Sequence, residues 1–124
     1  MNYVFRKKDV FRAEMKDPDR TAYVWVDGEE GAKNISAGSA DIPVNGGLPY
    51  HIHNKEEEVM FVYKGTGVLI VEGETFPLEP EAMVFMPPGL EHQFKNTGSE
   101  PLSFVWFYAP PGPEQKVRMM GKRK

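Results

Sequence analysis

The sequence contains no cysteine, so the chain can form no disulfide and offers no thiolate as a metal ligand or nucleophile. It also lacks an apolar run of the length that a membrane-spanning helix needs. The N-terminal stretch MNYVFRKKDVFRAEM carries charges where a secretory signal requires an apolar segment. Together these features predict a cytoplasmic protein with no membrane attachment.

A strong charge of either sign is also missing, because the net charge of the 124 residues is only −3. Such a balance gives no general attraction for nucleic acid. The charge is unevenly distributed: residues 114–124 carry five basic residues and one acidic residue, whereas residues 1–113 carry ten basic and seventeen acidic residues. We interpret the basic end as a solubilising tail rather than a nucleic-acid-binding arm, since it is short and has no interleaved aromatic residues.

Glycine and proline are frequent instead, with 12 and 11 residues, and they divide the chain into short segments. These segments are rich in valine, isoleucine and aromatic residues, which favour β-strands, and they span residues 21–26, 58–64, 67–73, 82–87, 91–96 and 101–110. Residues 104–108 are apolar at every position, which indicates a strand that is covered on both faces. The pattern predicts an all-β barrel whose second face packs on another sheet or on a partner subunit.

The two ends of the chain do not follow this pattern. Residues 9–15, DVFRAEM, are compatible with one or two helical turns. Three prolines between positions 110 and 113 predict that the tail, residues 111–124, leaves the barrel and ends in disordered residues. We therefore expect one domain over residues 1–124, with a barrel core at about 33–110 and an N-terminal arm at 1–20.

All three histidines stand close to the predicted start of a strand. His51 and His53 alternate in YHIH, so both side chains project from the same side of an extended chain. Glu58 opens the next strand after a short turn, and His92 follows the turn at Pro87–Gly89. Three imidazoles and one carboxylate suit a borderline divalent metal ion. An isolated HxH pair would be a weak signal, but this combination predicts a metal site.

The same residues resemble the two paired motifs of the cupin superfamily. The first motif, G(X)5HXH(X)3–4E(X)6G, and the second, G(X)5PXG(X)2H(X)3N, are matched at eight positions, namely His51, His53, Glu58, Gly65, Pro87, Gly89, His92 and Asn96. The opening glycines are replaced by Asn45 and Glu81. Asparagine adopts a left-handed turn easily and glutamate less so, so the turn before residue 82 is expected to differ in shape.

The resemblance covers roughly residues 33–110. It implies a double-stranded β-helix, a jelly-roll barrel, that holds one divalent transition metal per chain (Mn, Fe, Ni, Zn, Co or Cu) through His51, His53, Glu58 and His92. Glu58 is selected over Glu56 and Glu57 by its spacing to Gly65, and we interpret Glu56 and Glu57 as a solvated acidic turn. Small cupins commonly pair through their sheets, so the resemblance also predicts a homodimer.

Alternation along the strands predicts which side chains surround the metal. The expected pocket residues, for which plain barrel core is the alternative, are Met60, Val62, Met83, Phe85, Phe94, Phe104 and Trp106. Tyr50 and Tyr108 are candidate catalytic proton donors, with a structural role as the alternative for each. A pocket of this kind suits a ligand with an apolar body and an oxygen-rich head.

Two functions remain open from the sequence. The first is a metal-dependent enzyme, a dioxygenase, lyase, decarboxylase or isomerase, that acts on a small organic acid, carbonyl compound or sugar derivative. The alternative is a non-catalytic cupin that binds or senses a small ligand.

Overall fold

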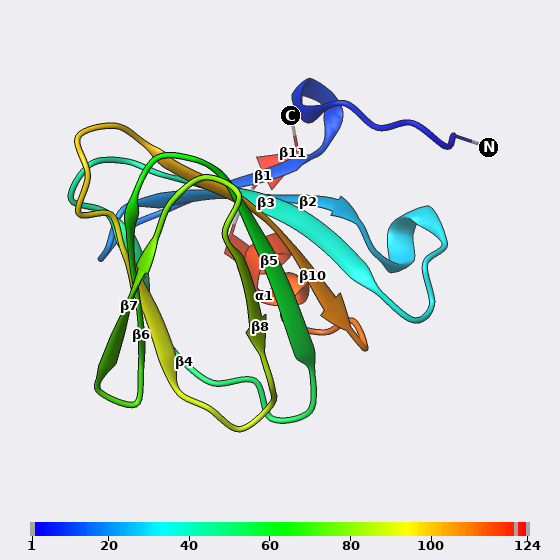
Figure 1. Ribbon diagram of the computed structural model, residues 1–124. Helices are drawn as coiled ribbons and strands as arrows, with labels where there is room; N and C mark the ends of the chain where they lie inside the picture. The colour runs from blue at the N-terminus through cyan, green and yellow to red at the C-terminus, as the bar shows by residue number, and fades with distance from the viewer. Residues whose placement is uncertain (1, 121, 124) are drawn as a thin grey trace.

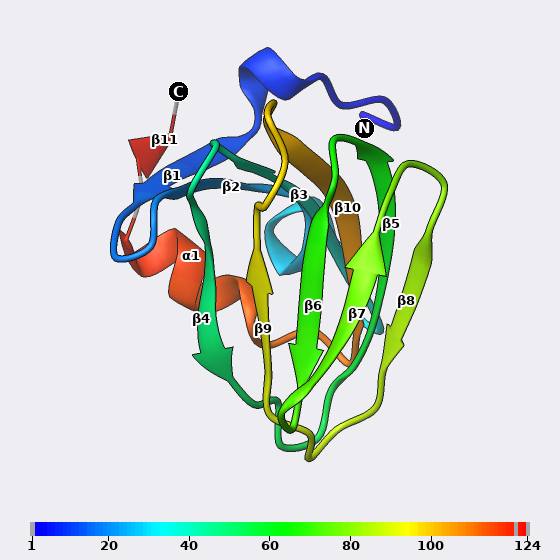
Figure 2. The ribbon, with the colours of Figure 1, turned by 60° about the vertical axis from the view of Figure 1, so that its left-hand side comes forward.

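Two antiparallel β-sheets lie face to face and enclose the hydrophobic core (Figure 1). The computed structural model describes residues 2–120 and 122–123. The larger sheet has the strand order β11-β1-β2-β3-β10-β5-β8, and the smaller sheet, which faces the viewer in Figure 2, has the order β4-β9-β6-β7. This arrangement is the predicted double-stranded β-helix, so the sequence-based prediction of the fold class is confirmed.

The strands and helices follow one another as the glycines and prolines of the sequence suggested. The strands are β1 (Phe11–Met15), β2 (Arg20–Val26), β3 (Ser36–Ile42), β4 (Gly47–His51), β5 (Glu57–Lys64), β6 (Gly67–Val71), β7 (Glu74–Leu78), β8 (Met83–Met86), β9 (His92–Lys95), β10 (Leu102–Ala109) and β11 (Lys122–Arg123). The helical elements are η1 (Lys7–Asp9), η2 (Gly28–Glu30) and α1 (Glu114–Met120). None of the helices in the described ranges is long and apolar enough to cross a membrane.

The core is built from alternate residues of strands that face each other across the two sheets. The strand β10 supplies the buried side chains of Phe104 and Trp106, and β9 supplies Phe94, whose ring stacks on Phe104 with the centroids 5.2 Å apart. Burying a side chain of this size stabilises the fold by about 1.5–3 kcal/mol. Opposite Trp106 on β3 stands Gly38, where a Cβ atom would overlap the indole ring, so only glycine lets the two strands approach here.

The N-terminal segment differs from the sequence-based expectation. Residues 11–15 form the strand β1 instead of a helical turn, and they pair with β2 in the register Phe11↔Val24 to Met15↔Arg20. The burial of Phe11 and Ala13 follows a period of two, which suits a strand. Pairing with β2 over five residues therefore outweighs the local tendency toward a helix.

The C-terminal segment also differs, because the tail does not leave the barrel. Residues 114–120 form the helix α1, which packs against β1 and β2, and Val117 contacts the hydrophobic core. Lys122–Arg123 then pair with β1 as β11. The prediction that the last residues are disordered also covers residues 121 and 124, and these two lie outside the described residues.

Candidate metal centre

Three histidines and one glutamate converge between the two sheets. His51 is the last residue of β4 and pairs directly with His92, the first residue of β9. His53 follows in the loop after β4, and Glu58 is the second residue of β5. One ligand atom from each of the four residues lies within 4.8 Å of the others. The structure therefore brings together all four residues that the sequence predicted as metal ligands.

Backbone carbonyl groups fix the orientation of two of the imidazole rings. His51 Nδ1 lies 2.8 Å from the carbonyl oxygen of Pro49, and His92 Nδ1 lies 2.9 Å from that of Leu90. Because a carbonyl oxygen only accepts a hydrogen bond, Nδ1 carries the proton in each neutral ring. The lone pair is then on Nε2, as metal coordination by a histidine with such a support requires.

The polar atoms at the centre of the cluster lack partners among the described residues. The Nε2 atoms of His53 and His92 and the Oε1 atom of Glu58 are buried and make no hydrogen bond. The Oε1 atom lies 3.3 Å from Nε2 of His53 and 3.7 Å from Nε2 of His92. A buried unsatisfied polar atom costs about 1–3 kcal/mol, so three at one point indicate a missing partner. A divalent cation would satisfy all three, and the residues present fit such an ion.

The electrostatics of the cluster favour a neutral His51 beside an ionised Glu58. Burial, together with the neighbouring His92, lowers the pKa of His51 to about 4. Burial by itself would raise the pKa of Glu58, but the adjacent rings of His53 and His92 outweigh this effect and leave its pKa below the usual value. These are the protonation states in which both residue types bind a metal ion.

A cavity of about 230 Å³ opens beside the cluster and is lined by three of its members, His51, His53 and Glu58. Phe104, Trp106 and Tyr108 of β10 line it, together with apolar residues from β1, β2, β4 and α1. Phe104 and Trp106 thus lie where the sequence analysis expected pocket residues. Three other expected pocket residues are buried in the core but do not line the cavity formed by the described residues, namely Met60, Val62 and Phe94.

Met83 and Phe85 lie on the opposite side of the barrel wall, so their assignment to the pocket was wrong. Their side chains are 68% and 58% exposed on the outer face of β8. The register explains the difference, because the inward-facing Glu58 pairs with Met86. The inner residues of β8 are therefore Val84 and Met86, and β8 is apolar at both parities, which hid this from the sequence.

The two candidate tyrosines have different surroundings. Tyr108 is buried, its ring lies 5.0 Å from the ring of His53, and burial together with the nearby Glu58 raises its pKa well above the usual value. Tyr50 is 54% exposed and lies outside the cavity that the described residues form. Only Tyr108 is therefore placed to contact a molecule in the cavity.

The turns near the two motifs agree with the sequence-based expectations only in part. Glu56 is buried beside Gly112 instead of lying in a solvated turn, whereas Glu57 is exposed as predicted. Asn45 and Glu81, which replace the opening glycines of the motifs, have φ angles of 69° and 72°. Both positions thus keep the left-handed backbone that glycine favours, so Glu81 does not remove that backbone conformation from the turn before β8.

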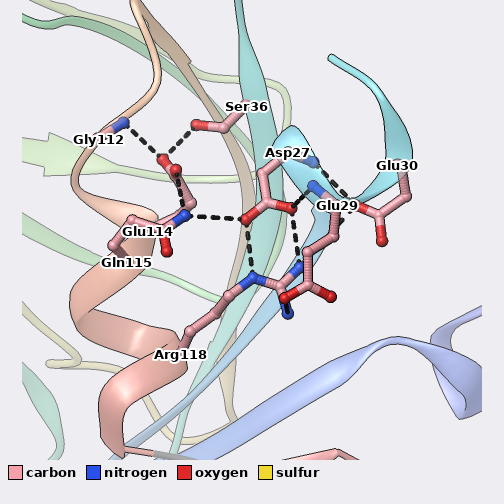
Figure 3. A network of polar contacts seen from close by, with 8 residues as sticks. All are labelled: Asp27, Glu29, Glu30, Ser36, Gly112, Glu114, Gln115 and Arg118. Carbon is pink, nitrogen blue, oxygen red and sulfur yellow. Dashed lines mark hydrogen bonds and ion pairs between the residues drawn. The ribbon is translucent and has the colours of Figure 1, made fainter. Parts of the chain in front are cut away.

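Sequence reasoning missed the contribution of α1 to this site. Lys116, Val117 and Met120 of the helix line the cavity. A buried polar network holds the helix in place (Figure 3): Arg118 donates from Nε and Nη2 to the carboxylate of Asp27 at 2.7 and 2.8 Å. Nothing in the sequence links two residues that are 91 positions apart.

A second group in this network fixes the beginning of the helix. Ser36 Oγ and the backbone N–H of Gly112 donate to Oε1 of the buried Glu114 at 2.7 and 2.8 Å, and Gln115 donates to Oε2 at 2.9 Å (Figure 3). The hydrogen bonds from these neighbours outweigh the effect of burial and lower the pKa of Glu114. The network therefore links the helix to Asp27, to η2 and to Ser36 of β3.

Comparisons with known proteins agree with this architecture. The cupin domain family model matches residues 38–108. The polyketide synthase CurC of Streptomyces cyaneus is 33% identical over 67 residues, which are 54% of this chain and 44% of that protein. A glucose-6-phosphate isomerase of Pyrococcus abyssi is 38% identical over 65 residues, which are 47% of this chain and 34% of that protein.

Among solved structures, a predicted oxalate decarboxylase of Thermotoga maritima aligns with a TM-score of 0.79 and 19% identity, over 88% of this chain and all of that one. At this identity the likeness concerns the fold alone. The chain spans 61% or less of the length of the curated relatives that it matches first. Since the family model covers more than half of the sequence and includes the four clustered residues, the chain belongs to the cupin family.

Proposed function

We propose that the chain is a metal-dependent enzyme that binds one divalent transition metal through His51, His53, Glu58 and His92 and acts on a small organic acid, carbonyl compound or sugar derivative. The observation that carries the proposal is the convergence of three buried, unpartnered ligand atoms on one point. When bound, a divalent metal would supply Lewis-acid activation of a substrate oxygen and, if it is iron, a site for dioxygen chemistry.

The protein groups around this point have separate roles. The carbonyl oxygens of Pro49 and Leu90 hold two histidines in the tautomer that binds a metal. Glu58 contributes one negative charge, so that a divalent ion with neutral imidazoles keeps a net positive charge. The aromatic side chains of Phe104 and Trp106 exclude water from one wall of the cavity, which strengthens electrostatic interactions within it.

An open cavity beside the ligand set supports catalysis over a purely structural metal. A structural metal site is normally closed by protein ligands, whereas a catalytic site keeps positions open for water or substrate. The apolar core is extensive without a metal ion, so the fold does not depend on one. The relatives and structural neighbours, which are named as a polyketide synthase, a glucose-6-phosphate isomerase and a predicted oxalate decarboxylase, span several reactions on one fold.

We propose further that the chain forms a homodimer through the outer face of the larger sheet. Phe107 of β10 is 44% exposed there, and Phe85 and Met83 of β8 are 58% and 68% exposed, with β5 between these two strands. Val59 and Phe61 of β5 pair with these residues and are also partly exposed, so the apolar surface is continuous. A contiguous apolar surface of this kind is typical of a protein–protein contact.

The enzymatic proposal is tested by a screen of protein loaded separately with Fe, Mn, Ni, Zn, Co and Cu. Small carboxylates, β-dicarbonyls, catechols and sugar acids serve as substrates, and both substrate loss and oxygen uptake are followed. We expect turnover with at least one metal and none with a variant that carries His51→Ala and His92→Ala. If every metal form binds a ligand tightly and stoichiometrically but none turns it over, the proposal of an enzyme is replaced by that of a non-catalytic binding protein.

A further inference from the structure

Two cationic side chains share the cavity with the candidate metal ligands. Arg20, the first residue of β2, and Lys116 of α1 both line it. Much of the remaining wall is apolar and includes Met15, Leu48, Phe104, Trp106, Val117 and Met120. Charged groups beside an apolar wall interact more strongly with an opposite charge than they would in bulk water.

Arg20 is held in position but keeps hydrogen-bond donors free. Its Nη1 atom donates to the carbonyl oxygens of Lys16 and Pro18, at 3.1 and 2.7 Å, in the turn between β1 and β2. Within the part of the chain that the structure describes, no carboxylate pairs with Arg20, and its Nε and Nη2 atoms have no partner. The planar guanidinium group is therefore fixed by its own turn and can still donate to an anion.

Two carboxylates also line the cavity, and both already have partners or a role of their own. Glu114 already accepts hydrogen bonds from Ser36, Gly112 and Gln115. Glu58 belongs to the cluster of candidate metal ligands. The two cations balance these two carboxylates, so a bound divalent ion would leave the cavity with a net positive charge.

Lys116 depends on the position of α1, which the network in Figure 3 determines. Arg118, two residues further along the helix, is anchored to the buried Asp27. Both Arg20 and Lys116 lie outside residues 38–108, the segment that the cupin family model matches. The cationic wall is therefore formed by the N- and C-terminal extensions of this chain.

We infer that Arg20 and Lys116 bind an oxyanion, a carboxylate or a phosphate, at the end of a substrate whose other end faces His51, His53, Glu58 and His92. The part of this inference that places the other end of the substrate at the metal centre rests on the proposed function. The substrate is then a small organic molecule with two polar ends, one anionic and one able to chelate a metal ion. Its apolar middle lies against Trp106 and Val117. Arg20 is the main specificity-determining residue, because it is partly buried and fixed by its turn, whereas Lys116 is exposed.

Isothermal titration calorimetry with matched ligands tests this inference without a need for turnover. The probes are a homologous series of 2-oxo diacids, each paired with the 2-oxo monoacid of equal chain length, and 2-oxo acids with a terminal phosphate ester. The members of a pair share the chelating 2-oxo carboxylate and differ at the distal end, which is anionic in one and apolar in the other. For Zn-loaded wild-type protein, we expect a diacid or phosphate ester of suitable length to bind at least about tenfold more tightly than the monoacid of the same chain length. The distal group, carboxylate or phosphate, that gives the larger gain in affinity over the monoacid identifies the preferred oxyanion.

The variants separate the distal contact from the metal contact. Arg20→Gln should remove most of the preference and leave the affinity for the monoacid unchanged, while Arg20→Lys should keep part of it. Lys116→Gln should lower the preference by a smaller factor. The first matched control is Arg12→Gln, because Arg12 forms an ion pair with Glu14 within β1 and does not line the cavity. The second is Lys95→Gln, at the exposed end of β9. Both controls should keep the wild-type preference.

Equal binding of the monoacids, the diacids and the phosphate esters by the wild-type protein, or an unchanged preference in Arg20→Gln, would overturn the inference. If the monoacids bind only to the metal-loaded form in that case, the proposed metal centre stands and only the cationic subsite is refuted. If the chain holds no metal, the proposed function fails. The same titrations with metal-free protein then decide whether Arg20 selects an anion on its own.

Discussion

The substitution Asp27→Asn should destabilise the protein by releasing α1 from the barrel. Asp27 is completely buried and accepts two hydrogen bonds from Arg118, one from Gln115 and one from the backbone N–H of Glu29. Asparagine keeps the shape of the side chain and can still cap η2, since both residues are good N-caps. The substitution therefore removes the charge and replaces one of the two acceptor oxygens, both of which accept hydrogen bonds, by an amide NH2 group that cannot accept one.

The magnitude follows from what Arg118 retains after the substitution. Breaking a buried ion pair by removing one partner costs about 3–5 kcal/mol when the other charge stays buried. The side chain of Arg118 is 10% exposed and keeps ion pairs with Glu29 and Glu30 at 3.4 and 3.9 Å. These contacts offset part of the loss, so we expect a decrease in the free energy of unfolding of about 2–3 kcal/mol. For a domain of this size the melting temperature should fall by roughly 10 °C.

The effect should depend on pH in a definite direction. Burial by itself would raise the pKa of Asp27, but the hydrogen bonds from Arg118 and from the backbone of Glu29 outweigh it and leave the pKa below the usual value. A depressed folded-state pKa contributes stability that is complete above the unfolded pKa of about 3.9 and is lost as the pH falls through the folded value. The stability difference between the wild type and Asp27→Asn should therefore be constant near neutral pH and shrink below about pH 4.

Urea denaturation followed by far-ultraviolet circular dichroism measures these differences. The matched control is Asp19→Asn, because Asp19 is exposed and does not belong to the polar network of Figure 3. A second comparison is the double variant Asp27→Asn with Arg118→Met, which leaves no unpaired buried charge and should recover part of the stability. If Asp27→Asn stays within about 0.5 kcal/mol of the wild type, the network in Figure 3 does not hold the helix in place.

Three further predictions concern the backbone and the surface. Glu81→Gly should stabilise the protein by about 0.5–1 kcal/mol because glycine adopts the left-handed backbone at this position without strain, and an unchanged or lower melting temperature would contradict this. Gly38→Ala should cost more than about 3 kcal/mol through overlap with Trp106, whereas Gly28→Ala, which meets no neighbouring atom, should cost little; equal urea midpoints would refute the contrast. Phe85→Glu should convert a dimer to a monomer in light scattering, and a monomeric wild type would contradict the proposed dimer.

The sequence was sufficient for the fold and for the four clustered residues because both depend on local patterns. Alternation places His51 and His53 on one side of a strand, a short turn returns Glu58 beside them, and the resemblance to the second cupin motif adds His92 to the same site. Short apolar strands between glycines and prolines are enough to indicate an antiparallel barrel. These signals do not depend on details of packing.

The rest of the site could not be predicted, because it depends on long-range contacts. The strand β8 is apolar at both parities, so only its register with β5 shows that Phe85 faces outward. The position of α1 depends on the pairing of Arg118 with Asp27, for which no local signal exists. Arg20 enters the cavity only because residues 11–15 form a strand that pairs with β2, a choice that local propensity did not indicate.

The most direct test of the proposed metal centre is elemental analysis of protein purified without a chelator or an affinity tag. We predict up to one transition metal ion per chain for the wild type. A variant with both His51→Ala and His92→Ala should contain none, while its circular dichroism spectrum should remain that of a folded β-protein because the hydrophobic core is built from apolar side chains of both sheets. A wild type without bound metal after incubation with each candidate ion, or a folded double variant that retains the full metal content, would contradict the assignment of these residues as ligands.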